Sequence, residues 1–190
     1  LGRPVFPCWW TSADGSCACS NGAKCANPGK HPYGPYAPSG FKDATTDEDT
    51  IRTWWNEQPR LNPAMPTGRV SKISVIDIDG HTGQQSLNDA GIDLPPTFLV
   101  NTPRDGGWHC WYQYNSGFRT GNGILPGIDL KNDGGYVMLP GAEIGGRRYF
   151  AHPEQSEEPV RWNDGPDVFI QPPEHRVDAR RIASDEPIPV

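Results

Sequence analysis

The sequence predicts an α+β domain in which a mixed β-sheet forms most of the core and helices are few. Several runs are rich in β-branched and aromatic side chains, as strands are. Clear helix signals occur in one segment of the N-terminal third and, more weakly, in one segment near the middle. The 22 glycines and 21 prolines among 190 residues predict many turns between short elements.

The N-terminal third is expected to contain a short strand, a long loop and a helix. Residues 3–10 (RPVFPCWW) have the apolar side chains of a buried strand interrupted by proline. Residues 11–40 hold turn-forming residues and three of the five cysteines, with almost no apolar periodicity. Apolar packing alone is therefore not expected to order this loop. Residues 44–59 predict a helix, because Thr46 or Asp47 can cap it, acids crowd its first turn and a proline closes it.

The middle of the chain consists mainly of predicted strands separated by Gly-rich turns. These strands lie at 71–79, 96–103, 107–114, 127–131, 135–141 and 146–151. A helix is predicted at 84–90. The turn Asn132-Asp133-Gly134 is a typical hairpin signal, so we expect the strands on either side of it to pair.

Length and charge favour one domain of ordinary size, at residues 1–152, followed by an acidic extension. Residues 153–190 are Pro-rich and carry nine acids and four arginines, which is typical of an extension that becomes a linker. The net charge of −6 argues against a broadly basic surface, although part of it resides in this extension. No apolar run is long enough to span a membrane, and no signal peptide is recognisable. We therefore expect a cytoplasmic protein and, since the chain starts at Leu1, a piece of a longer one.

Two carboxylates at the end of one strand form the first candidate site. Within VIDID, Asp77 and Asp79 point to one face and the isoleucines to the other. Two such charges about 4 Å apart repel by about 4 kcal/mol at an effective dielectric near 20. A bound Mg²⁺ or Mn²⁺ would relieve that repulsion. The alternative is that Asp79 only forms a turn and Asp77 only caps another group.

Two further strands present polar groups at Gly-flanked ends. Asp129 and Lys131 share one face of GIDLK, with apolar neighbours opposite. His109 follows a Gly-Gly turn, and taken alone it could equally be a structural histidine. Three strands that each carry a metal-seeking or phosphate-seeking side chain together indicate a site.

The loop at about residues 8–32 contains a second candidate metal site. Cys17, Cys19, Cys25 and His31 have the spacing C-x-C-x5-C-x5-H, and four N/S ligands at short spacing are typical of structural zinc. Cys8 is a spare candidate ligand. The alternative is disulfide bonding among Cys8 and the three loop cysteines, but nothing in the sequence suggests secretion.

Several motifs, in order along residues 4–150, resemble those of the archaeo-eukaryotic primase superfamily. They are VIDID, TPRDGGWH and GIDLK followed by GGYVMLPG, with support from GFKDATTD, the two-tryptophan helix and Thr67-Gly68. Within the superfamily the sequence is most similar to the bifunctional DNA primase/polymerase domain of plasmid and phage replication proteins. The resemblance implies an RNA-recognition-like catalytic sheet packed with a smaller N-terminal α/β part that carries a zinc loop.

The resemblance also implies a function and a set of site residues. It implies a DNA primase and DNA polymerase that uses nucleoside triphosphates, a primer and a single-stranded DNA template, with a helicase domain following. The metal ligands for Mg²⁺ or Mn²⁺ would be Asp77, Asp79 and Asp129. The incoming nucleotide would be bound by the following residues: His109, Lys131, Gly107, Thr67 and Gly68. One departure is Arg104-Asp105, which stands where the family usually has a shorter turn.

Two rival functions are compatible with parts of the sequence. The run VIDIDG resembles the start of haloacid-dehalogenase-like phosphatases, but that family needs Thr or Val where His81 stands. The second rival is a non-catalytic primase-like module that binds zinc and nucleic acid. Clustered carboxylates argue against a pure binder, because they repel the phosphates that such a module would hold.

Overall fold

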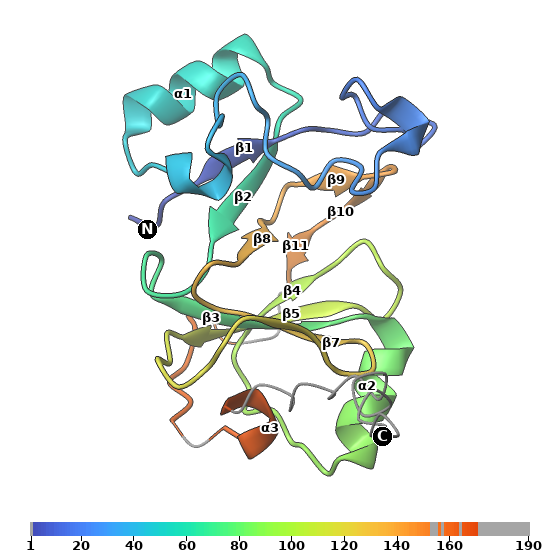
Figure 1. The fold of residues 1–190 in the computed structure, drawn as a ribbon, viewed down its shortest axis with the longest axis vertical. Helices are drawn as coiled ribbons and strands as arrows, with labels where there is room; N and C mark the ends of the chain where they lie inside the picture. The colour runs from blue at the N-terminus through green and yellow to red at the C-terminus, as the bar shows by residue number, and fades with distance from the viewer. Residues whose placement is uncertain (1, 153–155, 157, 164, 171–190) are drawn as a thin grey trace, which may run out of the picture.

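The computed structural model describes residues 2–152, 156, 158–163 and 165–170, and it has two halves (Figure 1). The upper half holds α1, β1 and β2, and the lower half holds the largest sheet with α2 and α3 on its outer face. The helices are α1 (Glu48–Glu57), α2 (Gly80–Asp89) and α3 (Asp167–Ile170), with short 3-10 turns at Gly22–Lys24 and Gly40–Asp43. The structure is thus α+β with few helices, as predicted.

A small three-stranded sheet organises the upper half. It has the order β1-β2-β8 and is antiparallel, with strands at Phe6–Cys8, Asn62–Pro66 and Tyr136–Met138. The helix α1 begins where the sequence predicts, because the Asp47 side chain accepts a hydrogen bond of 2.8 Å from Thr50 N. Trp54 is the buried residue of this helix.

A six-stranded sheet forms the lower half and carries most predicted strands. Its order is β11-β4-β5-β3-β7-β6, and β3 (Ile73–Ile78) lies between β5 (Trp108–Gln113) and β7 (Ile128–Lys131). The remaining members are β4 (Phe98–Asn101), β6 (Gly121–Leu125) and β11 (Phe150–Ala151).

Every strand pair in the described residues is antiparallel, so the expected mixed pairing is wrong. The physical reason is the position of β5. The crossover through α2 leaves β3 and β4 parallel to each other, but β5 is inserted between them and pairs antiparallel with both. The one parallel contact in the described part of the chain is an isolated bridge between Tyr112 and Val160.

The alternation of side chains along β3 gives the sheet two apolar faces. Ile73 and Val75 pack toward the three-stranded sheet, in a cluster that includes Phe6 and Met138. Ile76 and its same-face neighbours pack on the opposite side, and Trp162 and Phe169 belong to that second cluster. These last two residues come from the predicted acidic extension, of which the other described residues are 156, 158–161, 163, 165–168 and 170.

The turn at Asn132-Asp133-Gly134 does not close a hairpin, so that prediction is wrong. β7 pairs with β3 and β6, whereas β8 pairs with β2 in the other sheet. The turn is held by tertiary contacts instead, since buried Asn132 accepts from Ser74 Oγ at 3.0 Å and donates to Asn115 O at 3.0 Å. The segment therefore connects the two sheets.

The predicted strand at 146–151 is divided between two sheets. β10 (Arg147–Arg148) pairs with β9 (Glu143–Ile144) across Gly145 and Gly146, whose φ values of 56° and 77° suit a tight hairpin turn. Phe150 and Ala151 then join β4 in the large sheet. No helix in the described residues is long and apolar enough to cross a membrane.

Candidate active site and metal cluster

The register of three strands brings together the residues that the sequence singles out. Asp77 on β3 lies opposite His109 on β5 and, on its other side, opposite Asp129 on β7. Two residues further along, Val75 lies opposite Lys131. Because directly paired residues point to the same face, the Asp77, His109 and Asp129 side chains form one row across the sheet.

Burial disfavours charge on both members of the Asp77–His109 pair. Their closest atoms, Asp77 Oδ1 and His109 Nε2, are 3.6 Å apart, and the side chains are 21% and 5% exposed. Burial raises the pKa of Asp77, and the nearby His109 partly opposes that rise. Burial also lowers the pKa of His109, so its imidazole is neutral at pH 7. A further cation bound nearby would therefore strongly stabilise the ionised form of Asp77.

Asp129 is held between two hydrogen-bond donors. Lys131 Nζ lies 2.8 Å from Asp129 Oδ2, and Gly123 N donates to Asp129 Oδ1 at 2.7 Å. Lys131 Nζ also contacts Asn122 Oδ1 at 2.6 Å. The bulged strand β6 therefore positions both Asp129 and Lys131 of the GIDLK motif.

Asp79 lies just beyond β3 and not within it. It occupies the position preceding α2, and its backbone N–H donates to Gly127 O at 2.8 Å. Its carboxylate forms an ion pair of 3.2 Å with Arg104 Nε. Arg104 stands at the position where the sequence departs from the family's usual shorter turn, and its guanidinium also lines the cavity.

The row of polar residues lines a cavity of about 530 Å³ between the two halves of the molecule. Residues from the six-stranded sheet form one side of it. Tyr136 to Met138 of β8 and Lys30 of the N-terminal loop contribute to its lining. Three cationic and three acidic side chains share this lining: Lys30, Arg104, Lys131, Asp77, Asp79 and Asp129.

Three of the residues predicted to bind nucleotide do not line this cavity. Thr67 is buried and donates from Oγ1 to Asn132 O at 2.7 Å. Gly68 packs so closely on Asp133 that an added Cβ would lie 2.6 Å from its backbone N. Gly107 lines a neighbouring hollow instead. Thr67 and Gly68 thus support the turn whose Gly134 and Gly135 form part of the cavity wall.

The donor set of the cavity is of the chemical type that a hard divalent cation prefers, although no three of its described Asp and His side chains lie close enough together to share one ion in this structure. It offers carboxylate oxygens, which Mg²⁺ and Mn²⁺ prefer, from two adjacent strands and the start of α2. Asp79 and Asp129 are paired with Arg104 and Lys131, so cation binding would compete with those two contacts.

The cysteine-rich loop forms a compact cluster of side chains that could hold a metal ion. Cys17, Cys19, Cys25 and His31 bring their ligand atoms within 4.8 Å of one another, the one such group of three or more Cys, His, Asp or Glu among the described residues. Cys17 Sγ lies 3.4 Å from His31 Nε2. All five cysteines are free thiols, and Cys8 is buried in β1, outside the cluster.

Comparison with protein families gives a match over most of the chain. The family model of the bifunctional DNA primase/polymerase N-terminal domain, Prim-Pol, matches residues 1–175. A search of curated proteins found no match. The match covers both halves of the fold, the cavity and the cysteine cluster.

Proposed function

We propose that this chain, which belongs to the family of bifunctional DNA primase/polymerase N-terminal domains, is a template-directed nucleotidyltransferase whose active site is the cavity between the two halves. Family membership implies DNA primase and polymerase activity in replication. The observation that supports the location is the row of Asp77, His109 and Asp129 across three adjacent strands.

The acidic side of the cavity is proposed to hold the divalent cations. Asp77, Asp79 and Asp129 would bind Mg²⁺ or Mn²⁺ through their carboxylate oxygens. Such cations lower the pKa of a primer 3′-hydroxyl and neutralise the charge of the departing pyrophosphate. Asp77 is the residue best suited to this role, because burial raises its pKa and leaves its negative charge poorly compensated.

The basic side chains around the carboxylates are proposed to bind the triphosphate. His109 is neutral, so one ring nitrogen can donate a hydrogen bond to a phosphate oxygen. Lys131 and Arg104 lie at the carboxylates themselves, and Lys30 lies across the cavity, with Nζ 6.0 Å from the centre of the Tyr149 ring. These fixed positive groups are suited to orienting a triphosphate, since positioning is most of what phosphoryl transfer requires of a protein.

The cysteine cluster is proposed to bind one structural Zn²⁺ through Cys17, Cys19, Cys25 and His31. Four N/S ligands with no open position are typical of a structural site, and the metal would organise a loop that has few apolar side chains. Lys30 directly precedes the ligand His31, so an ordered loop also fixes the position of Lys30 at the cavity.

The proposed substrates are nucleoside triphosphates, a primer and a single-stranded DNA template. The motifs resemble those of phage and plasmid replication proteins, which supports a role in such replication, in the cytoplasm. In that setting a helicase domain would follow this one, and the acidic, Pro-rich extension would connect the two beyond its core residues Trp162 and Phe169.

Incorporation of a labelled nucleotide into a primer–template tests the proposal. With Mn²⁺ present, the wild-type protein should extend the primer, and Asp77→Asn should reduce the rate by several orders of magnitude, because the amide removes the charge that binds the cation. The alternative is a non-catalytic module that binds zinc and nucleic acid. A folded, zinc-loaded wild-type protein that binds DNA without incorporating nucleotides would establish that alternative.

A further inference from the structure

A second hollow, of about 560 Å³, lies beside the proposed active site. It is formed by the loop that follows β4, the start of β5 and the segment from Gly146 to Phe150. Its lining includes three arginines, Arg104, Arg147 and Arg148, against the single acid Asp105. In a chain with a net charge of −6, this concentration of arginine is a local exception that favours an anionic occupant.

Two of these arginines, Arg147 and Arg148, lie on the β9–β10 hairpin, which is fixed to the N-terminal loop. Gly145 N, at the turn of the β9–β10 hairpin, donates to Thr11 Oγ1 at 2.9 Å. Arg147 lies on the hollow side of this hairpin and donates from a terminal guanidinium nitrogen to Pro103 O at 3.3 Å. Arg148 forms an ion pair of 2.9 Å with Glu143 and keeps a side chain that is 71% exposed. Both guanidinium groups are therefore near the surface and are held in defined positions.

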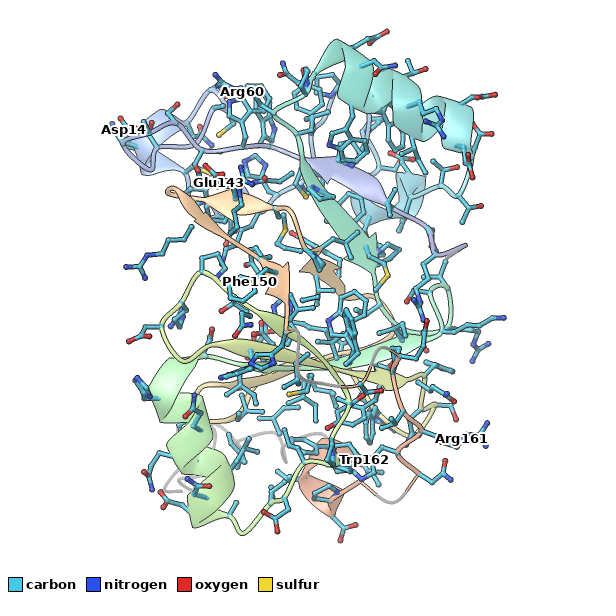
Figure 2. All side chains as sticks on the ribbon, turned by 180° about the vertical axis from the view of Figure 1, so that it is seen from behind. Asp14, Arg60, Glu143, Phe150, Arg161 and Trp162 are labelled. Atoms are coloured by element: carbon cyan, nitrogen blue, oxygen red, sulfur yellow. The ribbon has the colours of Figure 1, made fainter. Side chains whose placement is uncertain are left out.

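An exposed aromatic ring completes the hollow. Phe150 is 53% exposed, and Val70 is the one other large hydrophobic side chain so exposed in the described part of the chain. Figure 2 shows Phe150 at the level where the two halves meet. Asn101 also lines the hollow, and its buried Nδ2 has no hydrogen-bond acceptor among the described residues. An aromatic face, guanidinium groups and an unused amide donor are what a nucleotide base and its phosphates can use.

The hollow shares one lining residue with each of two neighbouring hollows. Arg104 lines it and also lines the active-site cavity, where it pairs with Asp79. At the other end, Arg148 is shared with a third hollow that contains Trp10 and Arg60. The Arg60 guanidinium lies 4.8 Å from the centre of the Trp10 ring. Arginines and aromatic rings thus occur in hollows that share lining residues, and together these hollows trace a path toward the proposed catalytic carboxylates.

We infer that this path, the Arg147–Phe150 track, binds single-stranded nucleic acid, with phosphates on Arg147 and Arg148 and a base stacked on the Phe150 ring. The inference rests on the proposed function, because it assigns the strand that enters the same active site. A base–aromatic contact tolerates any sequence, since every base has a π-face, and this suits a template strand.

Equilibrium binding of a labelled oligothymidylate, followed by fluorescence anisotropy, tests the track. Phe150→Ala and Phe150→Leu should each weaken binding about tenfold, because both remove the aromatic face and Leu keeps the apolar volume. Phe150→Tyr should bind as the wild type does. Against a strand of the same length without bases, all four proteins should have the same affinity. Loss of affinity for both strands alike would overturn base stacking on Phe150.

The salt dependence of the same binding tests the arginines. Arg147→Ala should lower the slope of log Kd against log salt by about 0.7 for each phosphate contact that is lost. Val70→Ala and Arg52→Ala are the controls. Val70 is an exposed hydrophobic residue like Phe150, at 60% against 53% exposed, and the Arg52 side chain is 72% exposed on α1, where it pairs with Glu48. Both controls should leave affinity and slope unchanged. A slope unaltered by Arg147→Ala would contradict the assigned phosphate position.

The outcomes separate this inference from the proposed function. If Phe150→Ala and Arg147→Ala bind oligothymidylate normally while the wild type incorporates nucleotides, the track is wrong and the catalytic assignment stands. If those variants lose affinity as expected but the wild type incorporates no nucleotide, the track stands and the enzymatic proposal fails. Repeating the measurement with oligouridylate tests whether the strand is DNA: the track should bind oligothymidylate more tightly, and tighter binding of oligouridylate would contradict a DNA template at this surface.

Discussion

Asp129 and Asp133 lie four residues apart, yet their carboxylates have different surroundings. Asp129 lines the cavity and contacts Lys131 at 2.8 Å. Asp133 accepts from Arg69 N at 2.7 Å and from Tyr114 Oη at 2.9 Å, so it holds the turn between the two sheets. We therefore propose a catalytic role for Asp129 and a structural role for Asp133.

Amide substitution at each position separates the two roles. Asp129→Asn should reduce nucleotide incorporation by several orders of magnitude, comparable with Asp79→Asn, because electrostatic stabilisation of the transferred phosphoryl group is usually the largest catalytic contribution. Asp133→Asn should leave the rate nearly intact. Melting temperature and zinc content must first show that both variants are folded. Normal incorporation by Asp129→Asn with an inactive Asp133→Asn would reverse the assignment.

The structural role of Asp133 should instead appear in the pH dependence of the free energy of unfolding. Hydrogen bonding from Arg69 N lowers the pKa of Asp133 below its ordinary value. Its contribution to stability is therefore present above an ordinary aspartate pKa of about 3.9 and is lost as the pH falls through the lower folded value. Because the side chain is exposed to solvent, the contribution should be under about 1 kcal/mol. The free energies of unfolding in urea of wild type and Asp133→Asn should differ at neutral pH and converge as the pH falls through the lowered folded pKa of Asp133.

At the residue scale, the sequence predicted which polar side chains share a face wherever a strand is regular. Asp77, Asp129 and Lys131 follow from alternation alone, although their register required the structure. Arg104 lies in a loop, where no periodicity indicates its direction. Thr67 and Gly68 were predicted to bind nucleotide from the family resemblance, but in the structure they support a turn. That role depends on residues about 65 positions away in the chain, such as Asn132.

At the scale of elements, α2 lies against the loop before β7 with no room between their backbones. A Cβ added to Gly83 would lie 2.3 Å from Gly127 O, and one added to Gly127 would lie 2.7 Å from Gly83 N. This contact fixes the start of α2, where Asp79 leaves β3 and its backbone N–H bonds Gly127 O. The approach of two backbones therefore helps to place a proposed metal ligand.

Replacement of Gly83 by Ala should destabilise the protein by about 1–3 kcal/mol, because backbone must move to admit the methyl group. Intrinsic helix propensity alone predicts the opposite sign, a gain of about 1 kcal/mol. The free energy of unfolding in urea decides between them. Asn88→Ala, at an exposed position of the same helix, is the control and should be neutral or slightly stabilising. A stabilised Gly83→Ala would show that α2 does not lie as closely against this loop.

The cysteine-rich loop is the element whose order should depend on a metal. Protein purified without added zinc should contain about one Zn²⁺ per chain, and Cys25→Ser should lower both the zinc content and the melting temperature. Cys110→Ser is the control for zinc content, which it should leave unchanged, since Cys110 lies on β5 and outside the cluster. A metal-free, folded preparation with disulfides between the loop cysteines would contradict the zinc assignment.

Strands were predictable where apolar, β-branched runs are long, as in β3 and β5. β2 was not, because Asn62–Pro66 contains two prolines that normally argue against a strand. β6 was missed for the same kind of reason, since Gly121–Leu125 contains two glycines and forms a bulged edge. The expected hairpin failed because a turn sequence specifies only the turn, whereas partner choice for β8 is set by burial against β2.

At the scale of the whole molecule, the two sheets form one site that neither could form alone. The large sheet supplies the carboxylates and His109, while β8 and the N-terminal loop supply further parts of the cavity lining. The chain crosses between the two sheets at residues 132–135, directly after the GIDLK motif. Strand β7, its proposed catalytic residues and the cavity wall are thereby linked through one short, hydrogen-bonded turn.

The central claim is that this cavity performs template-directed nucleotidyl transfer. Primer extension with a single nucleoside triphosphate, on two primer–templates that differ only in the first templating base, tests it most directly. In the presence of Mg²⁺ or Mn²⁺, the protein should extend the primer on the complementary template and not on the mismatched one. Extension of both templates alike, or of neither by a folded and zinc-loaded protein, would contradict the claim.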